Sequence, residues 1–598
     1  MYKNLREFLS RLEQAGELVR IAAPVDPVLE IAEITERMAR SPGGGKALWF
    51  EQSGTAFPVV TNLFGSDRRM ALALGVENLD EITARIDLLL RQLFPIRGGL
   101  ADKLRMLPLL GEMARWLPKQ VKGRGACQEV ILTGDRVRLS DLPILKCRPH
   151  DGGRFVTLPL VHTADPDTGA RNVGMYRMQV FSETTAGMHW QLHKTGERHY
   201  QACKRRGERM SVSISLGGDP ACTYAATAPM PDNMDEYLLA GFIRRRPVRL
   251  VKCITNDLYV PADCDFVIEG YVDPAEAKVT EGPFGDHTGF YSLEDDYPLF
   301  HVTAITHRRD ALYPATIVGI PPQEDCYIAR ATERIFLAPI RLALQPEICD
   351  LWLPAPGVAH NLAVVNMEKS YPGQAFKVAN SLWSAGQMMF SKFLLIVSCE
   401  TDIRTPGVLC SLLRQAHIPD DVLITKGVLD MLDHAAATPG FGGKLALDLT
   451  EYTPQTDALP EENNPRNWGV FVVYAAPESA MPNIPALLQR ERAEACRFVV
   501  VVDTAAQQLT PEELLWYAAG NTDVARDIRM AEGRIVIDAR SKIHGPPPFP
   551  ARWPNPVIAA PETIALVDRR WSEYGFSEPI DSPSLRYIPL LHSEKADV

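Results

Sequence analysis

The sequence has no hydrophobic run long enough to cross a membrane. Its longest apolar stretches, residues 393–399 and 498–502, fall far short of the roughly 18 residues that a transmembrane helix needs. The N-terminal stretch MYKNLREFL has no apolar core of the signal-peptide type. The formal net charge is −11, so no basic surface for nucleic acid is expected. We therefore expect a cytoplasmic protein with neither an integral membrane segment nor a nucleic-acid partner.

Paired cysteines and the common nucleotide and hydrolase motifs are missing as well. The 11 cysteines are scattered, odd in number and never spaced as CxxC, which predicts reduced thiols rather than a disulfide framework or a zinc site. The chain has no GxGxxG after a strand, no Walker loop, no GxSxG and no HExxH. Dinucleotide, nucleoside-triphosphate, α/β-hydrolase and zincin functions therefore lack support.

The composition is that of a globular chain, with 46% hydrophobic and 23% charged residues. At 598 residues it is too long for one core, so we expect several domains of mixed α/β and α+β class. Helix and strand patterns alternate over residues 1–115 and predict an N-terminal α/β domain. Short β-rich runs separated by glycine, proline and aspartate fill residues 116–310 and predict a barrel. Residues 311–455 and 456–598 return to alternating strands and helices.

The last two segments share a pattern. FLLIVSCETD (residues 393–402) and FVVVVDTAAQ (498–507) each predict a strand, and a helix and a further strand follow, LALDLTE in one case and RIVIDARSKI in the other. The order of elements matches but few residues are identical, so a duplication and an unrelated origin both stay open. The stretch EENNPR (461–466) predicts a linker between the two segments.

Two acidic residues flank a tight turn in the stretch TEGPFGDHTGFY. If Glu281 and Asp286 converge, their repulsion raises the pKa of one, which can then act as a general acid near neutrality. Arg177, in RNVGMYRMQV, is the candidate to hold the ionised carboxylate and to orient a substrate carboxylate. The alternative is that both acids belong to a solvated turn.

A second group of polar residues could hold a divalent cation. Asn172, His193 and Glu236 offer the oxygen and nitrogen donors that such a cation accepts. Glu236 is equally explained by its place in the first turn of a helix, where a carboxylate favours the helix dipole. His150 and His287 have no partner visible in the sequence and are expected to be structural.

Taken together, NVGMYR, MPDNMDEY, LVKCITNDLYVPADCDFVIEGY and EGPFGDHTGFY resemble the UbiD family of decarboxylases over residues 2–450. NTDVARDI, IDARSK and FPARWPNPVI resemble the longer bacterial members described as menaquinone biosynthesis decarboxylases or as 3-octaprenyl-4-hydroxybenzoate decarboxylase-like. The resemblance implies a split β-barrel flavin-binding domain at 116–310, an α/β dimerisation domain at 311–455 and a C-terminal α/β extension at 456–598. It also implies a homodimer or hexamer.

The resemblance further implies a cofactor site. Prenylated FMN would be anchored through Mn²⁺ or a similar cation held by Asn172, His193 and Glu236, with K⁺ held close by through the carbonyls of residues 225–228. Catalysis would fall to Arg177, Glu281 and Asp286. The full set of residues expected around the flavin is Asn172, Met175, Tyr176, Arg177, His189, Trp190, Leu192, His193, Glu236 and, at the phosphate, Lys369 with Lys377 as the weaker choice.

The implied activity is that of a carboxy-lyase. It would decarboxylate, reversibly and without oxidation, an aromatic or α,β-unsaturated acid, with a quinone-pathway hydroxybenzoate or naphthoate-type precursor expected and a flavin prenyltransferase supplying the cofactor. Another aryl, heteroaryl or acrylic acid is the alternative substrate. The alternative from a different functional class is a flavin-binding assembly partner that catalyses no reaction. The glycine-rich stretch PGFGGK (439–444) matches a segment that caps the substrate pocket in this family.

Overall fold

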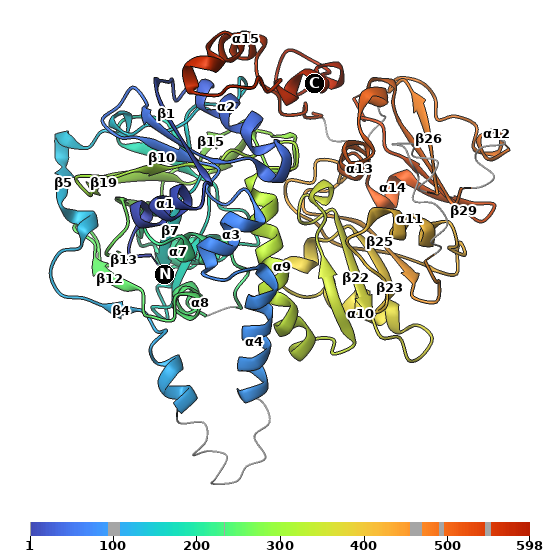
Figure 1. Ribbon diagram of the computed structural model, residues 1–598, viewed down its shortest axis with the longest axis horizontal. Coiled ribbons are helices and arrows are strands. Elements are labelled where there is room, and N and C mark those ends of the chain that lie inside the picture. Colours follow the sequence, from blue (N-terminus) through green and yellow to red (C-terminus); the bar gives the residue numbers. More distant parts are fainter. Residues whose placement is uncertain (1, 94–107, 232–233, 455–468, 490–495, 544–551) are drawn as a thin grey trace.

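The N-terminal part of the chain forms a small four-stranded sheet that a later strand completes. The computed structural model describes residues 2–93, 108–231, 234–454, 469–489, 496–543 and 552–598. The sheet order is β1-β2-β3-β20, so the chain returns to this sheet after passing through the barrel region (Figure 1). Its elements are α1 (Leu5–Gln14), β1 (Leu18–Pro24), α2 (Glu30–Ala39), β2 (Ala47–Gln52), β3 (Val59–Thr61), α3 (Asp67–Leu74), α4 (Leu79–Leu93) and β20 (Tyr313–Pro314).

The predicted barrel is a curled sheet of nine antiparallel strands. Its order is β6-β9-β10-β19-β14-β11-β7-β8, with β5 beside β19, and the end strands β6 and β8 do not pair, which leaves a half-barrel. Its strands are β5 (Val130–Thr133), β6 (Phe155–Val156), β7 (Leu160–Ala164), β8 (Arg171–Gly174), β9 (Met178–Val180), β10 (Thr185–Met188), β11 (Met210–Leu216), β14 (Phe266–Val272) and β19 (Leu299–His307). Smaller elements surround it: β4 (Lys119–Gln120), α6 (Thr195–Arg206), α7 (Pro220–Ala225), α8 (Glu236–Arg244), β12 (Arg249–Lys252), β13 (Tyr259–Pro261), β15 (Val279–Glu281), β16 (Phe284–Gly285), β17 (Tyr291–Ser292) and β18 (Asp295–Tyr297).

A long helix, α9 (Glu324–Ala343), leads to a five-stranded sheet of order β21-β22-β23-β25-β24. Strands β22, β23 and β25 are parallel, and β21 and β24 are antiparallel to their neighbours. One face packs on α9 and α10 through a cluster of apolar side chains. The elements are β21 (Ile348–Trp352), β22 (Leu362–Met367), α10 (Gln374–Leu382), β23 (Phe393–Ser398), α11 (Pro406–Leu413), β24 (Val422–Val428) and β25 (Phe441–Leu449).

The C-terminal extension contains a four-stranded sheet of order β26-β27-β29-β28. Three parallel strands and one antiparallel edge strand repeat the order and the directions of β22-β23-β25-β24. The strand–helix–strand pattern noticed twice in the sequence is therefore a repeat of topology. The elements are β26 (Val470–Ala475), α12 (Ile484–Leu488), β27 (Phe498–Asp503), α13 (Pro511–Gly520), α14 (Val524–Asp527), β28 (Ile528–Ala531) and β29 (Arg534–Asp538). The stretch expected to be a linker lies outside the described residues.

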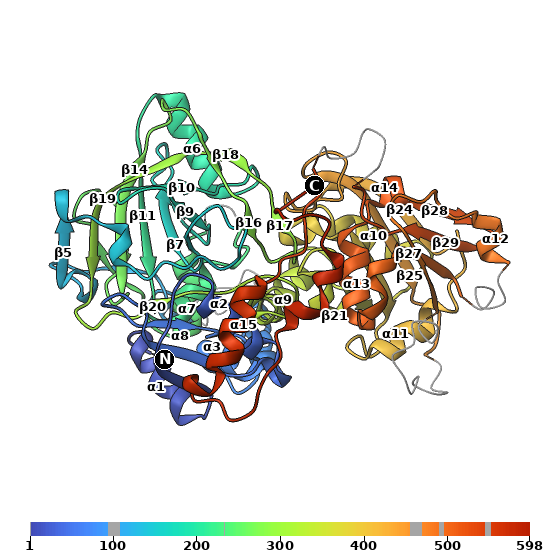
Figure 2. The ribbon, with the colours of Figure 1, turned by 90° about the horizontal axis from the view of Figure 1, so that it is seen from above.

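The last residues of the chain return to the N-terminal part. Helix α15 (Pro561–Arg570) lies beside α2, far from the four-stranded sheet that precedes it in sequence (Figures 1 and 2). The guanidinium of Arg37 contacts Asp568 at 2.6 Å, and Arg570 pairs with Glu30. The extension thus touches both ends of the molecule.

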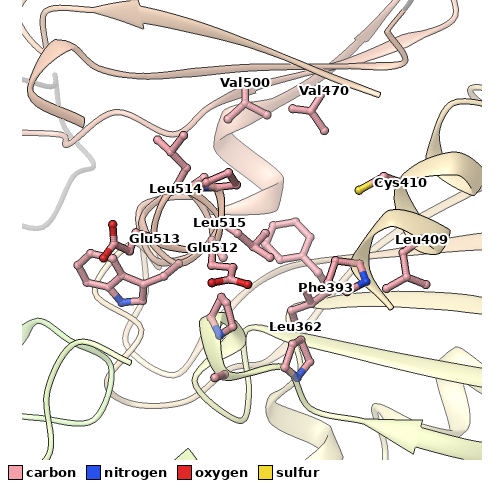
Figure 3. Close-up of a pocket in the computed structure, with 18 of the residues that line it drawn as sticks. Leu362, Phe393, Leu409, Cys410, Val470, Val500, Glu512, Glu513, Leu514 and Leu515 are labelled. Carbon is pink, nitrogen blue, oxygen red and sulfur yellow. The ribbon is translucent and has the colours of Figure 1, made fainter. Parts of the chain in front are cut away.

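A partly open cavity of about 600 Å³ lies between the two C-terminal sheets (Figure 3). Its walls are mainly apolar side chains of both sheets, among them Leu362, Phe393 and Val500. Helix α13 borders it with Glu512 and Leu515. No helix in the described part of the chain is long and apolar enough to cross a membrane.

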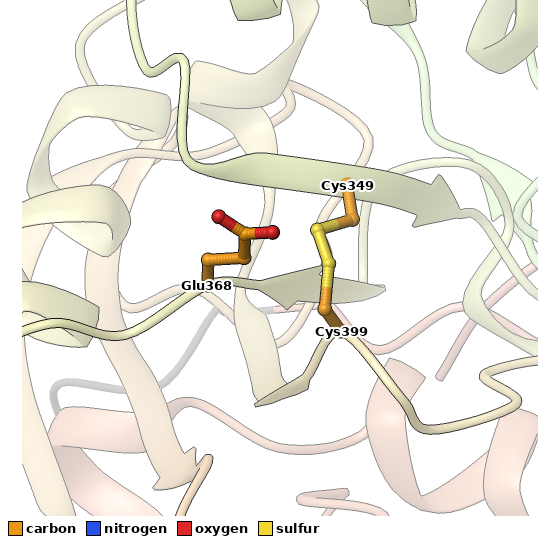
Figure 4. Close-up of side chains that lie close together, drawn as sticks. All are labelled: Cys349, Glu368 and Cys399. Carbon is orange, nitrogen blue, oxygen red and sulfur yellow. A yellow bond between two sulfur atoms is a disulfide. The ribbon is translucent and has the colours of Figure 1, made fainter.

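The expectation that every cysteine is a reduced thiol is wrong at one pair. Cys349 and Cys399 form a disulfide whose Cα atoms lie 5.9 Å apart, with Glu368 beside it (Figure 4). Strands β21 and β23 flank β22, and the chain segments that carry the two sulfurs meet where β22 ends. The pair is 50 residues apart in sequence, so local spacing gave no sign of it. The other nine cysteines form no disulfide in the described part of the chain.

Candidate active site

Arg177 lies between the two carboxylates that the sequence placed around one turn. Its Nε is 2.9 Å from Oε1 of Glu281, its Nη2 is 3.2 Å from Oε2, and its Nη1 donates to Oδ2 of Asp286. Nη2 also donates to the hydroxyl of Ser292 at 2.9 Å. All three charged side chains are buried, with Glu281 fully so. The alternative of a solvated turn is therefore wrong, and the three residues form one network.

The charges of this network differ from the expected ones. Burial opposes ionisation of Glu281, but the charge of Arg177 and a hydrogen bond to His189 outweigh it and lower its pKa to about 2. Burial likewise opposes ionisation of Asp286, and the charge of Arg177 and contacts with His287 lower its pKa below the usual range. The expected repulsion between the acids does not raise either pKa, because a guanidinium separates them. Neither carboxyl carries a proton at neutral pH in this arrangement.

Two histidines extend the network at its ends. Nδ1 of His189 lies 3.0 Å from Oε2 of Glu281, and its Nε2 is buried without a hydrogen-bond partner. Burial, and then the charge of Arg177, lower the pKa of His189. At the other end, Nδ1 of His287 lies 3.1 Å from Oδ1 of Asp286. Burial opposes protonation of His287, but its hydrogen bond to Asp286 and the nearby acids raise its pKa to about 9.

His287 was expected to be structural, and the structure makes it a charged neighbour of the site. Its ring lies 5.4 Å from that of His360, which precedes β22, and Asp430 and Asp325 add their charges. The site therefore lies where the half-barrel meets the five-stranded sheet. The one sequence signal for this role was the position of His287 directly after Asp286.

Asn172 and Glu236, two of the three expected metal ligands, meet at the peptide group between residues 172 and 173. Oε2 of Glu236 accepts the N–H of Val173 at 2.9 Å, and the amide of Asn172 is buried beside Thr163 at 3.5 Å. Burial raises the pKa of Glu236 to about 7. An amide and a carboxylate in a buried corner are donors that fit a hard divalent cation.

His193, the third expected ligand, is turned elsewhere. Its side chain is exposed, and its ring lies 5.9 Å from that of Phe390 in the C-terminal half. No hydrogen bond joins it to Asn172 or Glu236 in the described part of the chain. The donor set is therefore complete only if the loop of His193 turns inward.

The remaining residues expected around the flavin lie beside these two groups. Tyr176 covers Gly174 so closely that a Cβ there would lie 2.3 Å from its ring, and its hydroxyl accepts the N–H of Gly196 at 3.4 Å. Trp190 packs against the same Gly196. Leu192 is 66% exposed, although it is aliphatic.

The turn at residues 225–228, which is expected to hold K⁺, adjoins the end of β8. Its Ala226 carbonyl accepts the N–H of Met175 at 3.0 Å. The turn that supplies the expected K⁺ carbonyls is thereby fixed against the strand that supplies Asn172.

Lys369 is not where the resemblance put it. It follows the carboxyl end of β22, where its Nζ pairs with Asp448 and Glu451 at 2.8 Å each. His360, which reaches the site, precedes the other end of β22, and a six-residue strand spans about 20 Å. Lys369 therefore faces the opposite edge of the sheet. The weaker choice, Lys377, pairs with Glu347 at 2.7 Å.

The glycine-rich stretch at 439–444 lies beside His193. A Cβ on Gly440 would be 3.6 Å from Nε2 of His193. The following residues belong to β25, where the N–H of Gly443 donates to Asp523 of the extension at 3.3 Å. Lys444 is buried, and its Nζ donates to the carbonyls of Met389 and Ser391 at 2.7 Å.

Comparison with known families decides the identity of this fold. Three models match successive parts of the chain: the 3-octaprenyl-4-hydroxybenzoate carboxy-lyase N-terminal domain at residues 9–87, its Rift-related domain at 119–321 and its C-terminal domain at 326–449. The chain belongs to the UbiD family. Members of this family are carboxy-lyases, so the chain is a UbiD-type decarboxylase. The extension beyond residue 449 lies outside all three models.

Relatives of known sequence or structure support this family assignment. An uncharacterized protein of Aquifex aeolicus is 47% identical over 479 residues, which are 80% of this chain and 96% of that protein. The closed form of vanillic acid decarboxylase from Sedimentibacter hydroxybenzoicus matches with a TM-score of 0.65 and 27% identity, over 78% of this chain and 97% of that one. An evolved dimeric form of the UbiD-class enzyme HmfF from Pelotomaculum thermopropionicum, in complex with prFMN, matches with a TM-score of 0.64 and 26% identity, over 77% and 97%.

Proposed function

We propose that this protein removes CO₂ from an aromatic carboxylic acid with prenylated FMN as its cofactor, and that the acid is a quinone-pathway precursor of hydroxybenzoate or naphthoate type. The observation that carries the proposal is the buried contact of Arg177 with both Glu281 and Asp286. Loss of CO₂ from an sp² carbon leaves an electron pair that no side chain can stabilise. Prenylated FMN, when bound, supplies the electron sink for that pair.

The cofactor would be held by residues of β8, of α8 and of the segment after β10. Asn172 and Glu236 would bind Mn²⁺ or a similar cation, with His193 turning inward as the third ligand. Tyr176 and Trp190, together with the buried Nε2 of His189, fit the surroundings of a flavin. A flavin prenyltransferase would supply the modified cofactor, and a homodimer or hexamer is the assembly we expect.

The charged network would bind the substrate and keep it oriented. Arg177 carries one positive charge against the two negative charges of Glu281 and Asp286, and protonated His287 brings the sum of the four groups to zero. Protonated His287 thus offsets one of the negative charges that an anionic substrate would meet. Burial of all three acid and guanidinium groups keeps these interactions strong.

The proton that replaces CO₂ needs a source, because Asp286 is ionised. We assign it to His287, whose Nδ1 lies 3.1 Å from Oδ1 of Asp286. Asp286 relays the proton of His287 to the carbon that has lost CO₂, and a proton from bulk solvent restores the imidazolium. One proton enters the product and one CO₂ leaves, so the reaction needs no oxidant.

The test is to produce the protein together with a flavin prenyltransferase, record its visible spectrum and measure CO₂ release from a panel of aromatic, heteroaryl and acrylic acids. We expect turnover of a hydroxybenzoate or naphthoate-type acid. If the protein turns over only an acid of a different type, the proposed substrate is wrong. Cofactor binding without release of CO₂ from any of them would favour an assembly partner without turnover.

A further inference from the structure

The segment that carries Asp286 is held from outside by the C-terminal extension. Trp516, on α13, donates its Nε1–H to the backbone carbonyl of Thr288 at 2.8 Å. Its indole stacks on Phe290 with the ring centres 5.0 Å apart and the planes 23° apart. Trp516 is 1% exposed and Phe290 2%, so the contact is dry.

A second part of the extension pairs with the same segment along its backbone. The N–H of Tyr291 donates to the carbonyl of Asn555 at 3.1 Å, and the N–H of Val557 donates to the carbonyl of Gly289 at 2.9 Å. Phe290 and Pro556 form the β-bridge between these bonds. Both sides of the segment are therefore bound by residues beyond the parts that the family models match.

The segment itself is a closed turn whose shape fixes the position of Asp286. The N–H of Gly289 donates to the carbonyl of Asp286 at 3.0 Å, and the N–H of Asp286 donates to the carbonyl of Phe290 at 3.3 Å. Gly289 has φ +82°, and a Cβ there would lie 2.7 Å from Trp516, so the turn and the indole fit only with glycine at this position.

Helix α13 is not enclosed equally on all sides. Glu512 and Leu515 border the cavity between the two sheets (Figure 3), and Trp516, four residues after Glu512, belongs to the same lining. The cavity beside the helix gives it room to shift, because no packed atoms resist the movement there. The contacts of Trp516 with Thr288 and Phe290 are therefore needed to fix the helix and the turn against each other.

We propose that Trp516 is a positioning residue for Asp286: the extension holds the 286–290 turn so that the carboxylate keeps its contact with Arg177. The kinetic consequence rests on the proposed decarboxylase function. The structural consequence does not, so the two can be tested apart. A displacement of about 1 Å at a reacting group costs on the order of 100-fold in rate, which makes such support effective.

The experiment compares two substitutions that delete the same kind of bond. W516F keeps an aromatic ring beside Phe290, removes the bond to Thr288 and leaves a smaller ring, as the control does at its own site. The control, W571F, removes the bond from Nε1 of Trp571 to the carbonyl of Glu578 at 2.7 Å, and Trp571 also stacks on a phenylalanine, 4.6 Å from Phe576. Trp571 lies next to α15, away from the turn.

The first readout is hydrogen–deuterium exchange of the full-length protein, followed in peptides that cover residues 281–292. We expect W516F to speed exchange of this stretch about tenfold, since it leaves a buried carbonyl unpaired, while W571F leaves the stretch unchanged. Equal exchange of the stretch in W516F, W571F and wild type would overturn the proposal. If W516F does not fold, F290L replaces it, with the same two outcomes.

The second readout is kinetic and uses the enzyme loaded with its cofactor. W516F is expected to lower kcat about tenfold while KM and flavin content stay within twofold of wild type, and W571F is expected to match wild type. Unchanged kcat in W516F would show that the turn needs no such support. If wild-type protein releases no CO₂ from any acid, the decarboxylase proposal fails, and exchange alone decides whether Trp516 positions the turn.

Discussion

Nδ1 of His287 lies 3.1 Å from Oδ1 of Asp286, and this contact places an imidazolium behind the acid of the site. The acids around it, Asp286, Asp430 and Asp325, favour the protonated ring. Asp286 alone, ionised by Arg177, has no proton to give at neutral pH. Delivery of the proton, which the sequence assigned to Asp286 alone, is therefore shared by His287 and Asp286.

Replacing His287 with glutamine should remove the proton source while keeping a hydrogen bond to Asp286. We expect kcat to fall about 100-fold, the low end for a lost acid–base group. The pKa of His287 is raised from 6.5 to about 9, so its stabilising contribution is complete below pH 6.5 and is lost as the pH rises through 9. Wild-type kcat should therefore decline near pH 9, and the variant should lack this step.

The matched control for that variant is His301→Gln. His301 also pairs with a carboxylate, Glu276, at 2.7 Å, but at the surface of the half-barrel. Its pH profile should follow wild type. A decline near pH 9 that persists in the His287 variant would assign the titration to another group.

Replacing Asp286 with asparagine should leave the fold, the flavin and the metal in place and lower turnover by about 10²- to 10⁴-fold. The neutral amide can neither accept the proton of His287 nor deliver it. Steady-state CO₂ release together with the flavin spectrum measures both effects, and Asp295→Asn on the exposed edge of strand β18 is the control. Unchanged rates would remove Asp286 from its role.

Replacing Glu236 with glutamine keeps an acceptor for the Val173 N–H and removes the charge that would bind a cation. We expect Mn²⁺, measured by elemental analysis, to be lost together with much of the flavin, because the cation would link the protein to the cofactor phosphate. Restoring metal content at high Mn²⁺ concentration should restore part of the flavin. Full retention of Mn²⁺ and flavin by the variant in dilute solution would show the metal assignment to be wrong.

Replacing Lys369 with methionine should leave flavin content within about twofold of wild type. Its ammonium is occupied at the far edge of the sheet by the buried Asp448 and by Glu451, and the exposed pair with Glu451 contributes about 0–1 kcal/mol to stability. Thermal unfolding should shift little. A loss of flavin comparable to that of the Glu236 variant would restore Lys369 to the cofactor site.

The sequence predicted most of what depends on local pattern or on motif. Short strands between glycine and proline turns predicted a barrel, of which the structure has half, and the family resemblance implied the convergence of Arg177, Glu281 and Asp286, whose motifs lie about 100 residues apart. The repeat of topology at the C-terminus followed from two similar strand–helix–strand stretches.

What the sequence missed depends on distant contacts. The guanidinium of Arg177 lies between the acids instead of beside one of them, which reverses the expected change in pKa. The disulfide joins cysteines 50 residues apart, and Lys369 faces the wrong edge because a motif does not reveal which end of a strand a lysine follows. The role of Trp516 depends on a helix more than 200 positions from the turn it touches.

The repeated strand order at the C-terminus limits how far this polypeptide could be trimmed. Val364, Leu395 and Leu447, on the five-stranded sheet, line the cavity between it and the four-stranded sheet that repeats its topology. A polypeptide ending after β25 would expose these apolar side chains to water, and exposed apolar patches drive self-association. We expect that any abbreviated form would precipitate unless another surface shielded them.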